Sequence, residues 1–252
     1  MLLALQRGIT YGPVRSRRLG RSLGINVLPA GRKVCNFDCR YCQYGWNDSS
    51  PLASVADSDF PTVRKVLVAV AATLGALADP PAYLTFSGNG EPTLHPRLGE
   101  IVDGIVDLRD RHAPGARTAI LSNSSRAMDP QVRAALGRLD VRIMKLDAGT
   151  GACFRRYNGA LGGVTLEAIV EGLRALPDVT LQTLLTGGLA GNLDAAELDA
   201  WLGRVVAIRP RAVQLYTLDR EAPCDRIVPA TVEQLEGVRA RLGALGVATE
   251  VF

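Results

Sequence analysis

The sequence contains no hydrophobic run long enough to cross a membrane. Its longest apolar segment, residues 66–78, has 13 residues and includes Thr73 and Gly75, whereas a spanning helix needs about 20 apolar residues. The apolar run at residues 1–5 is shorter than a secretory signal, and its basic residue follows it instead of preceding it. These absences predict a cytoplasmic protein with no membrane association, in which cysteine thiols stay reduced.

Cysteine, histidine and aromatic residues are also scarce. Five cysteines in 252 residues exclude a disulfide-stapled scaffold, and the two histidines, His95 and His112, form no paired metal-ligand motif. Aromatic residues make up 5% of the chain, which is too few to predict a stacking platform for single-stranded nucleic acid. The 29 basic and 25 acidic residues give a net charge of +4, which by itself indicates no nucleic-acid partner.

The positive charge is unevenly spread. Six basic residues and no acidic one lie between Arg15 and Lys33. Such a run would suit contact with phosphate groups. The alternatives are a solvated basic loop, or a loop that contacts a bound anionic cofactor.

What the sequence does contain is a regular alternation of strand and helix patterns. At 47% hydrophobic residues the chain has enough apolar material for a core. The spacing predicts strands at 23–28, 83–87, 118–122, 141–146, 179–185 and 212–218, helices at 63–77, 98–109, 131–139, 166–176, 195–208 and 231–245, and a short last strand at 249–252. Thr165, Asp194 and Thr231 stand at helix N-cap positions. Alternation of this kind predicts a parallel sheet covered by helices, with functional residues at the carboxyl ends of the strands.

Three of the five cysteines follow the first predicted strand. Cys35, Cys39 and Cys42 form a C-x3-C-x2-C run. Three thiolates this close would share one metal centre and leave a coordination position open, as in sites that bind a substrate, and thiolates suit zinc or iron–sulfur clusters. Two alternatives are buried fillers on one helix face and a zinc site with His95 as fourth ligand.

A glycine-rich turn follows the second predicted strand. It reads Gly88-Asn89-Gly90-Glu91-Pro92. Small residues there let backbone N–H groups approach a ligand closely. The alternative is an ordinary tight turn between a strand and a helix.

Together these motifs resemble the radical S-adenosylmethionine (SAM) superfamily. The resemblance rests on the cysteine spacing, on Tyr41 before the third cysteine and on the Gly88–Pro92 turn. Residues 11–26 and 216–220 resemble, more narrowly, the group related to wyosine (tRNA base) synthases. With the alternation, this predicts an α/β fold of one domain over 1–252: a partial (β/α)6 TIM-like barrel of parallel strands at 23–245, a basic extension at 1–22, and a tail or short strand at 246–252.

The resemblance implies the cofactors and the chemistry. A [4Fe–4S] cluster would be held by Cys35, Cys39 and Cys42, with the fourth iron left for the amino and carboxylate groups of SAM. One electron from the reduced cluster would cleave SAM to methionine and a 5′-deoxyadenosyl radical, which abstracts hydrogen from a substrate. The electron donor implied is a low-potential flavodoxin or ferredoxin.

Further site residues are expected at the strand ends. The resemblance implies Tyr41 beside the adenine, the Gly88–Glu91 turn at the methionine amino group, and Ser122 and Asn123 at the ribose or carboxylate. The candidate cofactor-binding residues are thus Tyr41, Gly88, Asn89, Gly90, Glu91, Ser122, Asn123, Gln182, Tyr216 and Thr217. The candidate catalytic residues are Lys145, Asp147 and Cys224. An ordinary polar rim is the alternative for the later positions, and Cys153 is expected to be a spare thiol.

One departure from the resembled group bears on the substrate. Wyosine synthases of that group carry cysteines upstream for a second cluster, whereas no cysteine precedes Cys35 here, so we expect no second cluster from that region. Little sequence follows the last strand and helix, which predicts an open barrel side suited to a large substrate. The favoured function is therefore radical modification of tRNA or another RNA. The alternatives are modification of a peptide, protein or small metabolite, and a non-catalytic Fe–S or zinc-binding module.

Overall fold

The fold is built on one eight-stranded sheet that is almost entirely parallel. The structure is a computed structural model, which describes residues 2–47 and 55–252, so Met1 of the first apolar run lies outside the described residues. The strand order is β1–β2–β3–β4–β5–β6–β8–β10. The strands are β1 (Thr10–Ser16), β2 (Gly20–Ile25), β3 (Tyr83–Phe86), β4 (Arg117–Ser122), β5 (Val141–Lys145), β6 (Val179–Leu184), β8 (Ala212–Tyr216) and β10 (Thr249–Val251). Neighbours from β2 to β10 run parallel, and β1 pairs with β2 antiparallel.

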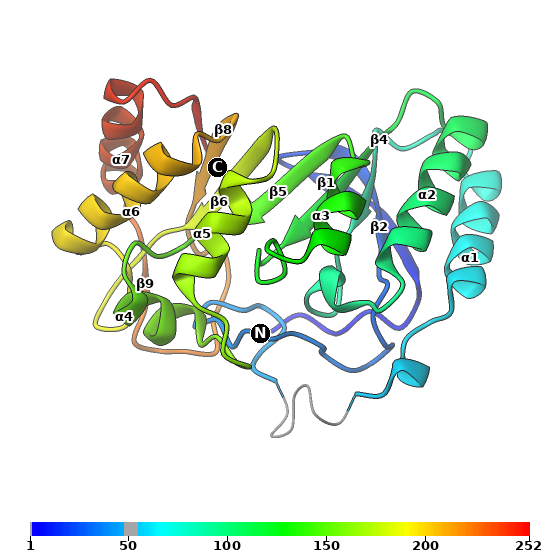
Figure 1. The fold of residues 1–252 in the computed structure, drawn as a ribbon, viewed down its shortest axis with the longest axis horizontal. Helices are drawn as coiled ribbons and strands as arrows, with labels where there is room; N and C mark the ends of the chain where they lie inside the picture. The colour runs from blue at the N-terminus through cyan, green and yellow to red at the C-terminus, as the bar shows by residue number, and fades with distance from the viewer. Residues whose placement is uncertain (1, 48–54) are drawn as a thin grey trace.

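Helices join the successive parallel strands and cover the outer face of the sheet (Figure 1). They are α1 (Val63–Ala76), α2 (Leu98–His112), α3 (Pro130–Gly137), α5 (Leu166–Arg174), α6 (Ala195–Ile208) and α7 (Val232–Ala244). The predicted caps are confirmed, because the side chains of Thr165, Asp194 and Thr231 each accept a hydrogen bond from a backbone N–H of the first turn. The predicted α/β alternation is thereby confirmed.

The central strands are largely buried on both faces, as parallel strands between helices and a filled interior must be. In β4, Thr118, Ala119 and Ile120 are all fully buried. Each apolar side chain of Ile size contributes about 1.5–3 kcal/mol when it is removed from water. The core therefore lies along the sheet, and the strands are a rigid support for whatever lies at their ends.

The N-terminal region differs from the prediction. Residues 1–22 were expected to extend from the barrel, but Thr10–Ser16 forms the edge strand β1, and β2 begins at Gly20 instead of residue 23. The edge strand is half exposed and contains Pro13, and both features weaken the alternation that marks a strand in the sequence. Arg17 and Arg18 consequently lie in the tight turn between two paired strands.

Short elements at the strand ends were also not predicted. They are α4 (Gly151–Cys153), the π-helix η3 (Phe154–Asn158), the 3-10 turns η1 (Asp57–Asp59) and η2 (Pro92–Leu94), and a two-stranded ribbon of β7 (Thr186–Gly187) and β9 (Val228–Pro229). Each is too short to show a hydrophobic period. They lie in the loops that connect the strands and helices, and Cys153, Phe154 and Tyr157 of α4 and η3 belong to the hydrophobic core.

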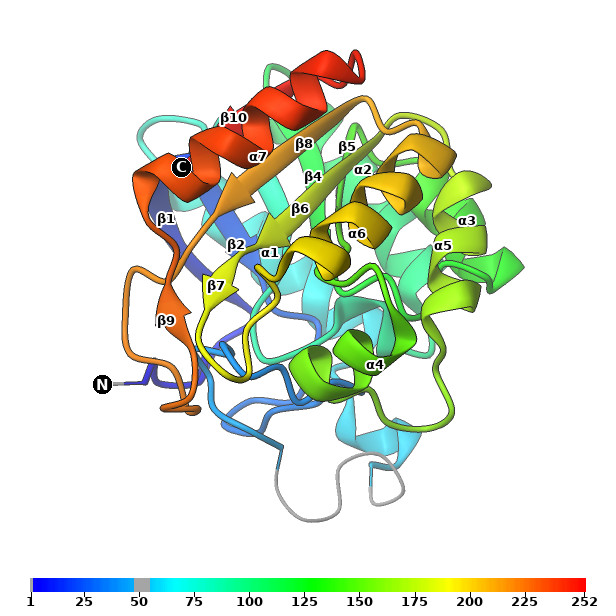
Figure 2. The same cartoon turned by 90° about the vertical axis from the view of Figure 1, so that its left-hand side faces the viewer.

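The carboxyl ends of the parallel strands meet at one end of the molecule. Figure 2 shows the arrowheads of β6 and β8 pointing toward the region that contains α4, β9 and the blue segment following β2. Within the described residues no helix is long and apolar enough to cross a membrane.

Candidate active site

The cysteine segment is fastened to the glycine-rich turn on one side. The backbone N–H of Val34 donates to the carbonyl of Asn89 (2.8 Å), and the N–H of Glu91 donates to the carbonyl of Val34 (2.9 Å). Gly90 has a φ of +139°, and a Cβ there would lie 1.9 Å from the carbonyl oxygen of Val34. Glycine is therefore required for this close approach, which sets Cys35 beside the turn.

On its other side the cysteine segment is fastened to the π-helix η3 and to the residues that follow it. The N–H of Asp38 donates to the carbonyl of Gly159 (3.1 Å), and the N–H of Arg40 donates to the carbonyl of Tyr157 (2.9 Å). Phe37 also forms an antiparallel bridge with Ala160. The three cysteines thus lie in a loop held at both edges above the strand ends.

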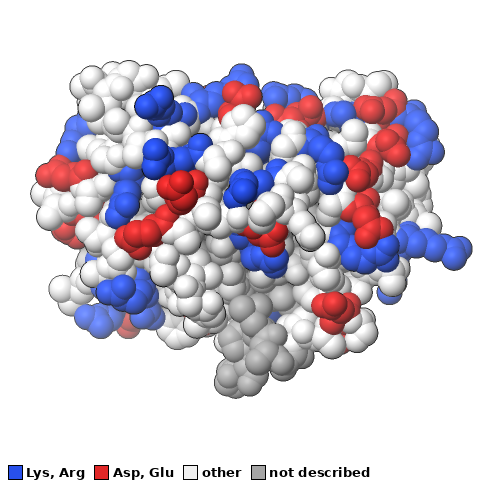
Figure 3. Space-filling model, viewed as in Figure 1, with Lys and Arg blue, Asp and Glu red and all other residues white. Residues whose placement is uncertain are grey.

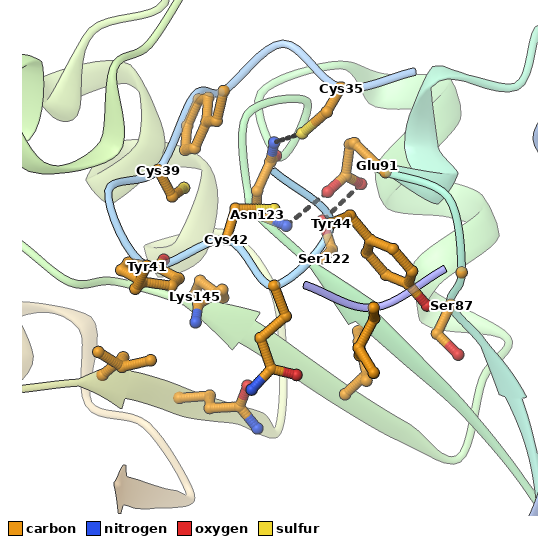
Figure 4. Close-up of a pocket in the computed structure, with 18 of the residues that line it drawn as sticks. Cys35, Cys39, Tyr41, Cys42, Tyr44, Ser87, Glu91, Ser122, Asn123 and Lys145 are labelled. Carbon is orange, nitrogen blue, oxygen red and sulfur yellow. Dashed lines mark hydrogen bonds between the residues drawn. The ribbon is translucent and has the colours of Figure 1, made fainter. Parts of the chain in front are cut away.

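This loop closes one side of a cavity of about 480 Å³ (Figure 4). The residues predicted for the site that line it are Cys35, Cys39, Tyr41, Cys42, Gly88, Gly90, Glu91, Ser122, Asn123, Lys145, Gln182, Tyr216 and Thr217. They come from segments as far apart in the chain as the loop after β2 and the end of β8. The fold therefore brings most of the predicted site together.

Two amide side chains point at cysteine sulfurs. Nδ2 of Asn123 donates to Sγ of Cys35 (3.6 Å), and Nδ2 of Asn158 donates to Sγ of Cys39 (3.7 Å). Burial raises the pKa of the Cys35 thiol, and it raises the pKa of Cys39 to about 11, with the neighbouring Cys42 adding to that rise. The unliganded thiols of Cys35 and Cys39 are therefore neutral at pH 7, and a bound cationic centre would take the place of their protons.

The arrangement of the thiols fits a cluster. Within residues 2–47 and 55–252 no three His, Cys, Asp or Glu side chains are gathered around a single ion position. A [4Fe–4S] cluster binds each cysteine at a different iron atom, so its ligands stand apart around a common space, as these three do around the cavity. Amide N–H groups donate hydrogen bonds to two of the three sulfurs, and metal-bound thiolates accept hydrogen bonds of this kind.

His95 is committed elsewhere. Its Nδ1 accepts from the N–H of Arg97 (3.0 Å), which leaves Nε2 as the donor to the carbonyl of Pro61 (2.9 Å). Burial lowers the pKa of the imidazole, so it is neutral at pH 7. Both ring nitrogens are used in fixing the chain near η2, and His95 does not line the cavity.

Glu91 ties the glycine-rich turn to the end of β4. Its buried carboxylate accepts hydrogen bonds from Thr93, from the hydroxyl of Ser122 (2.9 Å) and from the N–H of Asn123 (2.5 Å). Burial raises its pKa, against the effect of these hydrogen bonds. The network presents Ser122 and Asn123 to the same wall of the cavity as the turn.

A charged pair at the end of β5, Lys145 and Asp147, lies beside Tyr216 at the end of β8. Nζ of Lys145 donates to the hydroxyl of Tyr216 (2.5 Å) and lies 3.8 Å from Oδ1 of Asp147. Although burial lowers the pKa of Lys145, Asp147 and Tyr216 together hold it above its ordinary value. Lys145 is therefore a cation at the cavity wall.

Several predicted residues lie behind the wall or away from it. Asp147 does not line the cavity: it is buried and accepts from Tyr41, from Nδ2 of Asn158 (2.9 Å) and from the N–H of Leu184 (2.9 Å). The side chain of Asn89 bonds Gln6 and Pro29 instead of facing the cavity, and Cys224 is buried outside it.

Thr217 does line the cavity, but its hydroxyl is already used. It donates to the carbonyl of Leu185 (2.8 Å) and accepts from the N–H of Ala230 (2.7 Å). Asn158 and Arg18 are among the residues that the structure places at the site and that the prediction missed. The sequence offered a signal only for Arg18, which belongs to the basic run of residues 15–33.

The sequence from the cysteine segment onward matches a known family. Residues 33–198 match the model of the radical SAM superfamily. That segment contains the three cysteines, the glycine-rich turn and the ends of β4 and β5. The chain belongs to the radical SAM superfamily. A [4Fe–4S] cluster and SAM, the cofactors of that superfamily, are therefore this chain's cofactors, as predicted.

Individual relatives agree with this assignment. A UPF0026 protein of Synechocystis sp. is 34% identical over 226 residues, which are 86% of this chain and 77% of the relative. A radical SAM methyltransferase from Sphaerobacter thermophilus matches with a TM-score of 0.67 at 14% identity, over 92% of this chain and 65% of its own. TYW1 with a lysine-pyruvate adduct bound matches with a TM-score of 0.61 at 17% identity, over 89% and 73%.

These comparisons confirm the predicted fold and the resemblance to the radical SAM superfamily. At such identities the two solved structures bear on the fold alone. This chain spans about two thirds of the methyltransferase's length and about three quarters of the other two proteins.

The amide of Asn158 gives a prediction about the cluster. A hydrogen bond to a cysteine sulfur stabilises the reduced, more negative cluster, so Asn158→Leu is expected to make the cluster potential more negative. A redox titration followed by electron paramagnetic resonance measures the shift. The control is Asn47→Leu, because Asn47 bonds Phe37 and Asp38 in the same loop but no sulfur. Equal potentials in the two variants would contradict the assigned role.

Proposed function

We propose that the cavity is the active site of a radical SAM enzyme that modifies a large substrate, with tRNA or another RNA favoured. The observation that carries the proposal is that Cys35, Cys39 and Cys42 share one cavity with the glycine-rich turn and the end of β4. In the proposal these cysteines hold the cluster. When bound, the cluster supplies the electron that cleaves SAM to a 5′-deoxyadenosyl radical.

The chain's own residues would bind and orient SAM. The Gly88–Glu91 turn brings backbone groups close to the cysteine loop, which suits the methionine end of SAM. Ser122 and Asn123 face the cavity from β4, within reach of the ribose or carboxylate. The ring of Tyr41, held by its hydrogen bond to Asp147 and by the Tyr157 ring at 5.2 Å, offers a fixed aromatic surface for the adenine.

Lys145 would hold the substrate or the SAM carboxylate at the opposite wall. It is a cation whose direction is set by Tyr216 and Asp147, so little side-chain freedom remains to be lost on binding. We assign Lys145 as the residue that contacts the reactants and Asp147 as a positioning residue. Cys224 has no place in the proposed site, because it does not reach the cavity.

The favoured substrate size follows from the open sheet. Strands β1 and β10 are the two ends of the strand order and do not pair with each other, so the barrel is not closed by its own strands. On the face drawn in Figure 3 basic and acidic side chains are interspersed, and that face offers no basic field for a polyanion. An RNA would instead approach by the cavity, which Arg18 and Arg220 line.

The test is an anaerobic SAM cleavage assay. The protein is reconstituted with iron and sulfide, and 5′-deoxyadenosine is measured by mass spectrometry after addition of SAM and dithionite. We expect 5′-deoxyadenosine to form, and to form faster with bulk tRNA than without it. The physiological electron donor in the proposal is a low-potential flavodoxin or ferredoxin, which should replace dithionite.

Other outcomes would favour the alternatives. Stimulation by peptides or small metabolites but not by tRNA would replace the RNA proposal. A stable four-iron cluster that never cleaves SAM, with any of these additions, would instead indicate a non-catalytic iron–sulfur module.

A further inference from the structure

Arg18 is a cation with no acidic partner at the cavity wall. It lies in the turn between β1 and β2, and it lines the cavity. Its Nε is buried and has no hydrogen-bond partner. Among the described residues no carboxylate is paired with Arg18, whereas the adjacent Arg17 forms an ion pair with Asp219. A buried donor without an acceptor is costly, and this one belongs to a side chain that lines the cavity.

Aromatic rings hold the Arg18 guanidinium in place. Its central carbon lies 4.3 Å from the ring centre of Tyr216 and 5.6 Å from that of Phe252. These contacts span the gap between the first strands of the sheet and the last ones. A planar guanidinium fixed by stacking presents its N–H groups in a set plane, which matches the two oxygens of a carboxylate or phosphate.

Two other cations, Lys145 and Arg220, line the same cavity. Nζ of Lys145 lies 5.0 Å from the ring centre of Tyr216. Arg220, in the exposed loop after β8, lines the cavity and is paired with no acidic side chain of the described residues. The acidic side chains nearby are already engaged, because Asp219 is paired with Arg17 and Asp147 is buried behind the wall. This wall therefore carries excess positive charge.

The positive wall is formed by different segments from the cysteine loop, the glycine-rich turn and the end of β4, which would hold the cluster and the methionine end of SAM. The cysteine loop, the glycine-rich turn and the end of β4 form one side of the cavity, whereas Arg18, Tyr216 and Arg220 come from the β1–β2 turn and from the end of β8. Glu91, the acidic side chain on the SAM side, is enclosed by its own hydrogen bonds. The two sides of the cavity are thus suited to two different ligands.

We propose that Arg18 and Arg220 form a subsite for an oxyanion group, a carboxylate or a phosphate, of the substrate. In this proposal Arg18 makes the fixed bidentate contact and Arg220 closes over the group from the loop. The inference rests on the proposed function, because it takes the cavity to be the place where a substrate meets SAM. It adds that the substrate is bound through a negatively charged group beside Tyr216.

The experiment measures anion binding directly and involves no turnover. The full chain, with its cluster reconstituted and left oxidised, is titrated with inorganic phosphate and separately with acetate. Binding is followed by ligand-observed NMR, of phosphorus for phosphate and of labelled carbon for acetate. We expect one of the two anions to bind, and Arg18→Met to weaken that binding at least about tenfold, the loss that goes with one charge-assisted hydrogen bond. The anion that binds more tightly identifies the substrate group as phosphate or carboxylate.

Matched variants separate this site from general charge effects. Arg15→Met removes the same charge from β1, but Arg15 does not line the cavity, so it should leave binding unchanged. Arg18→Lys keeps the charge and loses the planar fork, so its affinity should fall between those of the wild type and Arg18→Met. Arg220→Met should also weaken binding. Because Arg220 lies in an exposed loop, this variant is expected to fold even if Arg18→Met does not.

Two results would overturn the inference. The first is anion binding that is equal in the wild type, Arg18→Met and Arg220→Met, or that is absent from all of them. The second is loss of anion binding when S-adenosylhomocysteine is added, because the cations would then serve the cofactor's own carboxylate. Neither result depends on SAM cleavage, so failure of this inference is distinguishable from failure of the proposed function.

Discussion

Alanine in place of Cys35, Cys39 or Cys42 is expected to abolish both iron binding and SAM cleavage. All three thiols line the same cavity, and a cluster that keeps one iron open for SAM has three protein ligands and none to spare. Loss of a single thiolate leaves one iron without a protein ligand. The surroundings of Cys35 and Cys39 are buried, so no other group takes the place of the missing thiolate. Iron content and 5′-deoxyadenosine formation measure the two effects.

The other two cysteines supply the controls for this experiment. Cys153 is buried in α4, and Cys224 is buried outside the cavity. Cys153→Ala should keep both the iron and the 5′-deoxyadenosine, and Cys224→Ala should keep the iron. If any one of the three loop variants still yields 5′-deoxyadenosine, the ligand assignment is wrong.

The second large effect is expected at Gly90. A methyl group there would lie 1.9 Å from the carbonyl oxygen of Val34, at a backbone φ of +139°. Strain at such a φ costs about 1–3 kcal/mol, and overpacking against the backbone costs about as much again. Gly90→Ala should therefore lower the free energy of unfolding by about 3 kcal/mol or more. It should also separate Val34 from the turn and so displace Cys35.

Denaturant unfolding and iron content would measure the two consequences of Gly90→Ala. Gly75→Ala is the matched control, because Gly75 is exposed on α1 and has open space where the methyl group would go. That change should stabilise the chain by about 0.5–1 kcal/mol, since alanine is the better helix former. Unaltered stability and iron content in Gly90→Ala would show that the contact with Val34 does not hold the cysteine loop.

The layout of the sheet and helices was predictable because it depends on local patterns. The helix predicted at 195–208 is α6 itself, and the predicted helix at 63–77 ends one residue beyond α1. The caps at Thr165, Asp194 and Thr231 were predictable from the sequence because each involves only one side chain and the backbone N–H three residues later. The edge strand β1 was missed because its exposed side and Pro13 blur the period on which such predictions rest.

The candidate site was predictable to a different extent at each position. The cysteines and the glycine-rich turn were found because their spacing is itself the signal, and parallel strands place their carboxyl ends together. Asn158 was missed, since its approach to Cys39 depends on the π-helix and on contacts between residues more than 100 positions apart. Asp147 was predicted at the cavity but lies behind it, where strand alternation alone could not place it.

The sequence by itself therefore determined the superfamily and the alternation of helices and parallel strands, and it predicted the three thiol ligands, since each depends on residues close together in the chain. Only the tertiary structure decided which side chains share the cavity. The contact of Arg18 with Tyr216 joins a turn near the N-terminus to the end of β8. No pattern in the sequence indicates that these two residues are in contact. The physical reason is that alternation specifies which face of a strand a residue occupies, whereas packing between distant segments decides what stands opposite it.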